Sequence, residues 1–246
     1  MEQDRFSRLR LLIGAKALAQ LHRRRVAVFG VGGVGSYAVE ALARAGIGHL
    51  TLVDPDRIVS SNINRQLHAL EQTLGQLKVE VMANRCRAIH PAMEIVTHPC
   101  RYSSENAQEL LAPGFDYVLD CIDTITDKID LIARCDGAGV PVISALGAAN
   151  KIDPSRVRCG DLFATSNCRL ARVLRKELRR RAVAGPIRAV YSTEEFRPLT
   201  HAQPQQRTAG GSWQRVPLGT LSTIPSLFGL MMAGDVLKQW LEAENE

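Results

Sequence analysis

The stretch FGVGGVGSYAVEALARAGIGHLTLVDPD, residues 29–56, decides the fold of this chain. It begins at the end of a short apolar run, VAVF, which is typical of a buried parallel strand. Gly30, Gly32 and Gly35 follow in the pattern G-x-G-x-x-G, directly before a helical pattern, so phosphate oxygens can approach backbone N–H groups at the positive end of that helix. Asp54 ends the next apolar run, where its carboxylate is placed to accept hydrogen bonds from ribose hydroxyls. The stretch predicts a nucleotide-binding unit.

Strand and helix patterns alternate around this unit. Periodic apolar positions predict helices over residues 34–45, 76–89 and 126–138, and strands are expected at VAVFG, HLTLVD, EIVTH, FDYVLDCID and VPVISALG. This alternation predicts an α/β fold, a doubly wound and mostly parallel Rossmann-like sheet with helices on both faces.

The two ends of the chain add to this core. Leucine and isoleucine recur at roughly helical spacing in residues 4–22, at Leu9, Leu12, Ile13, Leu18 and Leu21, which predicts an amphipathic helix. Beyond residue 150 we expect an irregular C-terminal extension, with a basic helix over 167–183, a mobile loop over 194–217 and a closing helix over 221–241. The prediction is one domain, 1–246, made of an N-terminal helix (1–22), a nucleotide-binding core (23–150) and the extension (151–246).

Composition narrows the class of protein. The chain has 246 residues, 46% of them hydrophobic, and a formal net charge of +6, which favours a globular protein with an anionic partner. The longest apolar run, 224–234, is shorter than the roughly 20 residues of a membrane-spanning helix, and no signal peptide is visible. The six cysteines are scattered without a C-x-x-C pair. We therefore expect a soluble cytoplasmic protein with reduced thiols, no membrane association and no structural zinc.

The residues after Asp54 discriminate between two nucleotides. A nicotinamide dinucleotide needs no further cations here, whereas cleavage of the α–β bond of ATP develops charge on pyrophosphate that cations must meet. Arg65 lies in a polar loop and Lys78 at the start of the next helix, and both are suited to that role. Asn62 and Asn64 could hold phosphate or ribose oxygens. The pattern favours ATP.

Five motifs in unbroken order over residues 5–150 carry a resemblance to a family. They are GVGGVGS, the pair Asp54 and Asp56, SNINRQ, Lys78 after GQ, and LDCIDT. This set resembles the E1-like (ThiF-type) family of ATP-dependent adenylating enzymes, which includes ubiquitin activators and bacterial activators of sulfur-carrier proteins.

The resemblance implies a role for each matching residue. Asp123 would help to hold Mg²⁺, and Arg8, or with less weight Arg5, would reach the ATP of the partner in a homodimer. The implied catalytic set is Arg8, Arg65, Lys78 and Asp123. The implied nucleotide-binding set is Gly30, Gly32, Gly33, Gly35, Asp54, Asp56, Asn62, Asn64, Arg65 and Lys78.

The second half of the chain resembles one branch of this family. Activators of sulfur carriers typically have two C-x-x-C pairs, which are absent here, and NKIDPSRVRCGDL, AVYSTEEFRP and PLGTLSTIPSLFGLMMAGDVLK resemble the tRNA threonylcarbamoyladenosine dehydratases. That resemblance implies adenylation of the threonyl carboxylate at adenosine 37 of tRNA, then ring closure with net loss of water. A sulfur-transfer protein or cysteine desulfurase is a further candidate partner.

Charge supports a tRNA partner independently. Residues 169–188 carry eight Lys or Arg against the single acid Glu177, a stripe suited to a phosphodiester backbone. The predicted tRNA contacts are Arg169, Arg172, Arg175, Lys176, Arg179 and Arg180.

Three alternatives remain open on the sequence. The chain could be an adenylyltransferase that activates the C-terminal glycine of a ubiquitin-like sulfur-carrier protein. It could be a nicotinamide-dependent oxidoreductase, which leaves Arg65 and Lys78 unexplained. It could also be a non-catalytic RNA-binding module that keeps nucleotide for stability.

Overall fold

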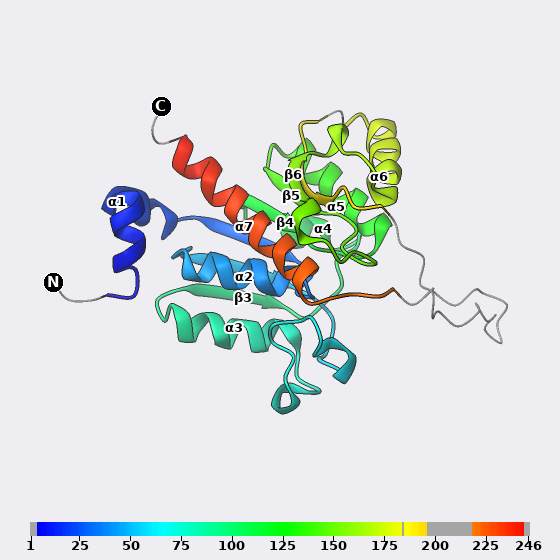
Figure 1. Ribbon diagram of the computed structural model, residues 1–246. Coiled ribbons are helices and arrows are strands. Elements are labelled where there is room, and N and C mark those ends of the chain that lie inside the picture. The colour runs from blue at the N-terminus through cyan, green and yellow to red at the C-terminus, as the bar shows by residue number, and fades with distance from the viewer. Residues whose placement is uncertain (1–3, 184, 196–217, 244–246) are drawn as a thin grey trace.

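A computed structural model describes residues 4–183, 185–195 and 218–243 of the chain. A twisted sheet forms its centre, with helices packed on both faces (Figure 1). Residues 196–217, most of the predicted mobile loop, lie outside the described residues.

The sheet has seven strands in the order β3-β2-β1-β4-β5-β7-β6. All neighbouring pairs are parallel except β6 and β7, which are antiparallel. The strands are β1 (Arg25–Phe29), β2 (His49–Val53), β3 (Glu94–His98), β4 (Tyr117–Asp120), β5 (Val142–Ala145), β6 (Val157–Asp161) and β7 (Arg188–Ser192). The order reverses between β1 and β4, the point at which doubly wound sheets open a crevice for ligands. The predicted fold class is confirmed.

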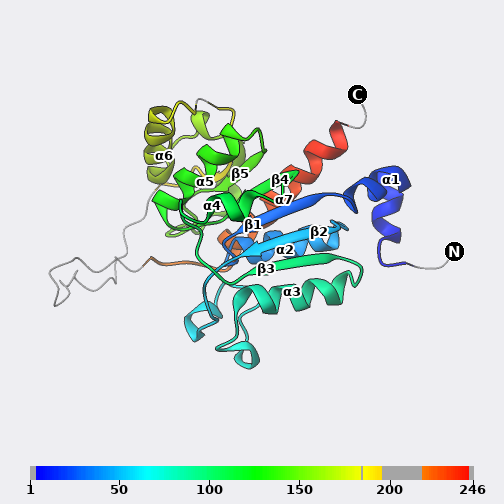
Figure 2. The same ribbon diagram turned by 180° about the vertical axis from the view of Figure 1, so that it is seen from behind.

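Seven α-helices belong to the described residues. They are α1 (Ser7–Leu21), α2 (Gly35–Arg44), α3 (Lys78–Ile89), α4 (Ala107–Leu111), α5 (Ile125–Gly137), α6 (Arg169–Arg180) and α7 (Thr223–Glu242). One core cluster unites apolar residues of α2, α3 and α7 with one face of the sheet. A second unites α4, α5 and α6 with the opposite face, and the view from behind shows both layers (Figure 2).

In the C-terminal part, the sequence predicts strands at SRVRCGDL and IRAVYS, and these stretches contain β6 and β7, which extend the central sheet beyond β5. Helix α7 then returns across the sheet and packs along α2. The contact is close because Gly229 has no side chain: a Cβ atom there would lie 2.2 Å from the carbonyl oxygen of Val34. Since Val34 lies within the glycine turn, α7 helps to hold that turn in place.

Helix α1 differs from the expected amphipathic helix. Gly14 has φ of 82° and ψ of 164°, which interrupts the helix, so the residues before and after it do not share one face. Leu18 and Leu21 are buried as expected, but Leu12 is 83% exposed. The predicted apolar stripe is therefore wrong at Leu12.

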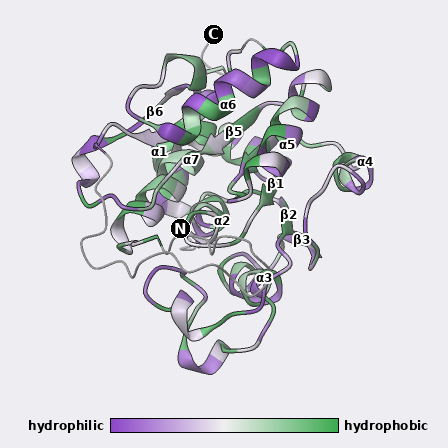
Figure 3. Ribbon diagram, turned by 90° about the vertical axis from the view of Figure 1, so that its right-hand side faces the viewer, coloured by the Kyte–Doolittle hydropathy of each residue, from purple (hydrophilic) through white to green (hydrophobic). Residues whose placement is uncertain are grey.

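The hydropathy of the residues differs between the central sheet and the basic helix. The strands at the centre are green in Figure 3, whereas α6 alternates between purple and green along its length. This alternation comes from basic residues separated by the buried Ala171, Leu174 and Leu178. Among the described residues, no helix has the length and apolar character needed to cross a bilayer.

Candidate active site

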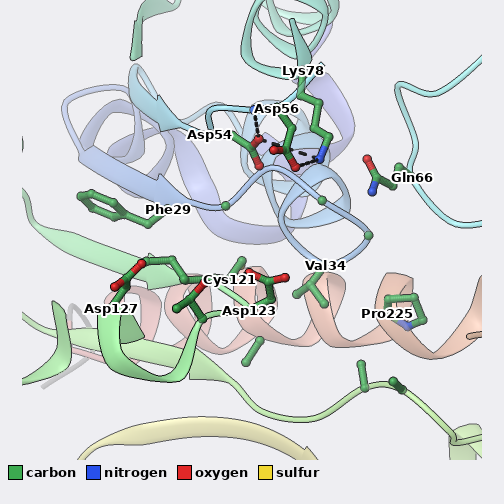
Figure 4. A pocket seen from close by; sticks show the side chains of 18 of the residues that line it. Phe29, Val34, Asp54, Asp56, Gln66, Lys78, Cys121, Asp123, Asp127 and Pro225 are labelled. Carbon is green, nitrogen blue, oxygen red and sulfur yellow. Dashed lines mark hydrogen bonds and ion pairs between the residues drawn. The ribbon is translucent and has the colours of Figure 1, made fainter. Parts of the chain in front are cut away.

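A pocket of about 620 Å³ opens at the carboxyl edge of the sheet, around the ends of β1, β2, β4 and β5. In Figure 4, Asp54, Asp56 and Lys78 lie on one side of it, and Asp123 and Asp127 lie on the other. The sequence-predicted residues that line it are Gly30, Gly32, Gly33, Asp54, Asp56, Asn62, Arg65, Lys78 and Asp123. The predicted residues Gly35, Asn64 and Arg8 are not part of the lining.

The glycine turn is built from close backbone approaches. Gly30 has φ of 88°, and a Cβ atom there would lie 2.6 Å from the carbonyl oxygen of Cys121. A Cβ atom at Gly35 would lie 1.9 Å from the carbonyl oxygen of Gly30, so Gly35 lets α2 start tightly against β1. At Gly32 the nearest atom would be 3.8 Å away. The turn is therefore packed at Gly30 and Gly35 and open at Gly32, where a phosphate can approach.

Asp54 organises the loops at the end of β2. Its carboxylate accepts hydrogen bonds from the backbone N–H groups of Val31, at 2.6 Å, and of Asp56, at 2.9 Å. Burial raises the pKa of Asp54, against the opposing effect of the nearby Lys78 ammonium. Asp54 therefore ties the glycine turn to the end of β2 and lies in the pocket wall, as the ribose prediction requires.

Lys78 supplies a buried cation. Its Nζ atom lies 2.6 Å from Oδ2 of Asp56 and 3.8 Å from Oδ1 of Asp54, although the side chain of Asp56 is itself 61% exposed. Lys78 begins α3, and its backbone N–H donates to the carbonyl of Asp56. The side chain of Lys78 therefore does not lie on a solvent-exposed face of α3, where a lone lysine is usually found.

The SNINRQ loop brings a second cation to the pocket. Arg65 donates from Nη1 to the carbonyl of Ser61 and to Oδ1 of Asn64, both at 2.8 Å. The buried Asn62 lines the pocket and caps its own loop by accepting from the N–H of Val59. Asn64, in contrast, donates from Nδ2 to the carbonyl of Thr220 at 3.1 Å.

Gln66, the last residue of that loop, was not singled out from the sequence. It is buried, it lines the pocket, and its Oε1 atom has no hydrogen-bond partner among the residues that the structure describes. A buried amide oxygen without a donor is costly, so a ligand with a hydrogen-bond donor would be favoured beside it. Its position in the SNINRQ motif is the sequence feature that could have identified Gln66 as a site residue.

Two carboxylates line the pocket, one in the loop after β4 and one at the start of α5. Asp123 is exposed and lines the pocket. Asp127, which sequence reasoning missed, lies in the first turn of α5 and accepts from Nε and Nη2 of Arg101, at 2.9 and 2.7 Å. No pattern in the sequence linked Arg101 to Asp127, because 25 residues, which include α4 and β4, separate them.

Asp120 has a structural environment. It is fully buried, and its Oδ2 atom accepts from Nζ of Lys128 and Oγ of Ser144, both at 2.7 Å. Lys128 also donates to the carbonyl of Ala145 at 2.9 Å. The pair ties β4, β5 and α5 together below the pocket, so the role of Asp120 is structural.

The two ends of the pocket differ in composition. Towards β3 it is lined by Phe29, Val53, Cys100, Tyr102 and Ile122, which form an apolar end suited to a base. Towards β5 and α6 it is lined by Leu146, Gly147, Ala148, Ala149, Leu170, Leu218 and Thr220, which we call the acyl end. The sequence did not predict that these residues line the pocket, because residues far apart in sequence meet there only after the sheet closes.

The basic helix presents most of its cations outward. Arg169, Arg172, Lys176, Arg179 and Arg180 are exposed. Arg179 lies 5.2 Å from the ring centroid of Phe163, and Arg180 pairs with Glu177 at 2.8 Å. Arg175 instead turns inward and donates to the carbonyl of Thr165, at 2.8 Å. It fastens α6 to the preceding turn, whereas the prediction placed it on the tRNA-facing stripe.

Arg8 is exposed on α1, and α1 lies at the amino edge of the sheet, opposite the pocket (Figure 1). Arg5 donates to the carbonyl of Ile89 at 2.6 Å, which also lies at that edge. Neither arginine reaches the pocket of its own chain.

Known proteins resemble the whole chain. A tRNA threonylcarbamoyladenosine dehydratase of Bacillus subtilis is 38% identical over 242 residues, covering 96% of this chain and 94% of that protein. The crystal structure of the Escherichia coli tRNA N6-threonylcarbamoyladenosine dehydratase in complex with ATP superposes with a TM-score of 0.87 at 33% identity, covering 98% of this chain and 95% of the other.

The similarity to a second kind of enzyme covers less of the chain. A molybdopterin-synthase adenylyltransferase of Salmonella typhimurium is 38% identical, but over 154 residues, which are 62% of this chain and 61% of that protein. The profile of the ThiF family matches residues 6–246. This extent of similarity, together with the glycine turn, Asp54 and Lys78 in one pocket, leads to one conclusion: the chain belongs to the ThiF family.

Proposed function

We propose that this chain is an ATP-dependent tRNA threonylcarbamoyladenosine dehydratase, which cyclises the threonylcarbamoyl group on adenosine 37. The observation that carries the proposal is the continuity of the pocket. It runs from Gly32 and Lys78 to Leu170 of α6, so the nucleotide site opens directly onto the basic helix. The similarity of nearly the whole chain to the two dehydratases described above supports the same substrate.

The first step would be adenylation. A carboxylate oxygen of the threonyl group attacks the α-phosphorus of ATP and pyrophosphate leaves. Arg65 and Lys78 would stabilise the charge that develops on the departing phosphates, with Gly32 and Gly33 supplying backbone N–H groups and Asn62 a phosphate contact. Asp54 would hold the ribose, and the apolar end would hold the adenine.

The second step would need no enzyme nucleophile. A nitrogen of the same substituent attacks the acyl carbon, AMP leaves and the ring closes, so that water is lost overall. Because nucleophile and acyl group belong to one substrate, the pocket has only to hold them together. The small side chains of Gly147, Ala148 and Ala149 leave space for that group at the acyl end.

Magnesium fits this pocket with one protein carboxylate as its anchor. Within the described residues no group of three or more His, Cys, Asp or Glu could hold a metal alone. Mg²⁺ is usually held by one or two carboxylates together with substrate phosphates, and Asp123 is an exposed carboxylate in the pocket wall. Bound there, the ion would neutralise phosphate charge.

Macromolecular partners complete the proposal. Arg169, Arg172, Lys176, Arg179 and Arg180 would bind the tRNA backbone, with Arg175 fixing their helix. A second copy of the chain would be needed to bring Arg8 to the ATP, since α1 lies far from the pocket of its own chain. A sulfur-transfer protein or cysteine desulfurase is the third candidate partner, which co-purification with the chain tests.

The test is direct. Purified protein is incubated with ATP, Mg²⁺ and tRNA that carries threonylcarbamoyladenosine, and the nucleosides are weighed by mass spectrometry. We expect AMP and a nucleoside that is lighter by one water. An unchanged nucleoside mass, with ATP–pyrophosphate exchange stimulated by a small carrier protein instead of tRNA, would select the adenylyltransferase.

A further inference from the structure

The side-chain amide of Asn64 is engaged at both ends. Its Nδ2 atom donates to the carbonyl of Thr220 at 3.1 Å, and its Oδ1 atom accepts from Nη1 of Arg65 at 2.8 Å. A carbonyl only accepts and a guanidinium only donates, so these partners fix the orientation of the amide. Asn64 therefore joins the Arg65 guanidinium to the main chain at Thr220.

Thr220 belongs to residues 218–220, which we call the acyl-end segment because Leu218 and Thr220 line that end of the pocket. A second asparagine holds the same segment from the other side. The N–H of Asn150 donates to the carbonyl of Gly219, and the N–H of Gly219 donates to Oδ1 of Asn150, both at 2.8 Å. The acyl-end segment is thus fastened to both the SNINRQ loop and the turn after β5.

The nitrogens of the Arg65 guanidinium differ in their hydrogen bonds. Nη1 is occupied by Ser61 and Asn64, while Nε and Nη2 donate no hydrogen bond within the described part of the chain. Because the guanidinium is planar, fixing one nitrogen against two acceptors fixes the plane in which the other nitrogens can meet phosphate oxygens. Misplacement by about 1 Å is enough to cost up to roughly 100-fold in rate.

We propose that Asn64 is a positioning residue for adenylation, which aims Arg65 at the phosphates and couples that aim to the acyl-end segment. The sequence pattern suggested a direct contact between Asn64 and the nucleotide, whereas the geometry points to action through Arg65. The proposal rests on the proposed function, because it takes Arg65 as the group that meets the developing charge.

Variants of Asn64 separate its two hydrogen bonds. Asn64→Ala removes both, and Asn64→Asp keeps an acceptor for Arg65 but loses the donor to Thr220. The matched control is Asn84→Ala on α3, because Oδ1 of Asn84 accepts from Nη1 of Arg87 at 3.0 Å on an exposed surface outside the pocket lining. The readouts are tRNA-dependent ATP–pyrophosphate exchange, the dehydrated nucleoside and the melting temperature.

We expect Asn64→Ala to lower kcat of exchange about tenfold, with KM for ATP and the melting temperature close to those of the parent chain. Asn64→Asp should retain more of the exchange than Asn64→Ala, and Asn84→Ala should behave as the parent does. Normal exchange in Asn64→Ala, or a loss that accompanies a lowered melting temperature, would overturn the proposal.

A double-mutant cycle gives the sharpest test. If Asn64 acts through Arg65, the variant with both residues changed to Ala should exchange no more slowly than Arg65→Ala alone. A further tenfold loss in the double variant would show independent action and overturn the proposal. Failure of the proposed function would give a different result, because the parent chain itself would then make no dehydrated nucleoside. In that case the double-mutant cycle can be run with whichever substrate supports ATP–pyrophosphate exchange.

Discussion

The Nζ atom of Lys78 lies 2.6 Å from Oδ2 of Asp56, at the first turn of α3. Lys78 is only 4% exposed, and Asp54 provides a second carboxylate 3.8 Å away. The fold therefore holds a cation at the rim of the glycine turn and compensates its burial with neighbouring acids. A triphosphate in the pocket would offer this ammonium more negative charge than Asp56 does.

Replacement of Lys78 by Ala should abolish most of the turnover. We expect kcat for the dehydrated nucleoside to fall by about 100-fold or more, because one cation facing the departing pyrophosphate is lost. Affinity for tRNA should change less than about twofold, since Lys78 is buried and the predicted tRNA contacts lie on α6. Lys16→Ala, on the exposed side of α1, is the control. Retained turnover in the Lys78 variant would contradict this role of Lys78, whereas a parent chain that binds tRNA without turnover would favour a non-catalytic RNA-binding module.

Two glycines of one turn should respond differently to Ala. At Gly35 the new Cβ would lie 1.9 Å from the carbonyl oxygen of Gly30, so backbone must shift, and we expect a loss of about 1–3 kcal/mol in the free energy of unfolding. At Gly32 the nearest atom would be 3.8 Å away, so Gly32→Ala should fold normally and bind ATP more weakly. Urea unfolding and nucleotide titration measure the two effects. Equal loss of stability in both variants would contradict the assignment.

The exposed cations of α6 should bind tRNA through salt-dependent contacts. Arg172→Ala and Lys176→Ala should each weaken binding and lower the slope of log K against log salt by about 1, with KM for ATP unchanged. Arg87→Ala, on α3, is the control for a general loss of charge. An unchanged slope would remove these residues from the tRNA-binding surface.

Acidification should destabilise the chain through His68. Burial is the main cause that lowers the pKa of this side chain from its ordinary 6.5, and its Nε2 atom lies 2.7 Å from the carbonyl oxygen of Val31 in the glycine turn. Below about pH 6.5 the unfolded chain takes up a proton that folded His68 does not, so stability falls as pH decreases from 6.5 through the lowered pKa of the folded state. The stabilising contribution is fully present above 6.5.

Urea unfolding at pH 7.5 and pH 5.5 measures this effect. His68→Gln keeps a donor for the Val31 carbonyl but does not titrate, so its loss of stability on acidification should be smaller than that of the unmodified chain. Burial also lowers the pKa of His22 and His90, and because both remain in the variant, the comparison isolates His68. An identical pH dependence in the two proteins would exclude this histidine as the cause.

Residues with a local signature could be predicted from the sequence. Gly30, Gly32 and Asp54 follow strands, and the carboxyl ends of neighbouring parallel strands must meet at one edge, so their convergence follows from the order of elements. Lys78 was recognisable as the residue that starts a helix after a polar loop. In the structure all four line one pocket.

Residues whose role depends on a distant partner were not found. The Arg101–Asp127 pair joins the loop after β3 to the first turn of α5, and Gln66 gains importance only through burial. Arg175 shares the spacing of its basic neighbours, yet it turns inward because Thr165 offers a carbonyl. Helical spacing gives the direction of a side chain relative to its helix, but not which acceptors surround it.

The sequence alone determined the alternation of strand and helix, the phosphate-binding turn and the charge of α6, because each depends on residues a few positions apart. Only the tertiary structure decided that Leu170 and Thr220 meet the glycine turn in one pocket, and that Asn64 faces Thr220 instead of the nucleotide site. The physical reason is that these residues come from distant segments, with Asn64 and Thr220 156 residues apart, and that packing of the whole sheet and its helices sets their geometry.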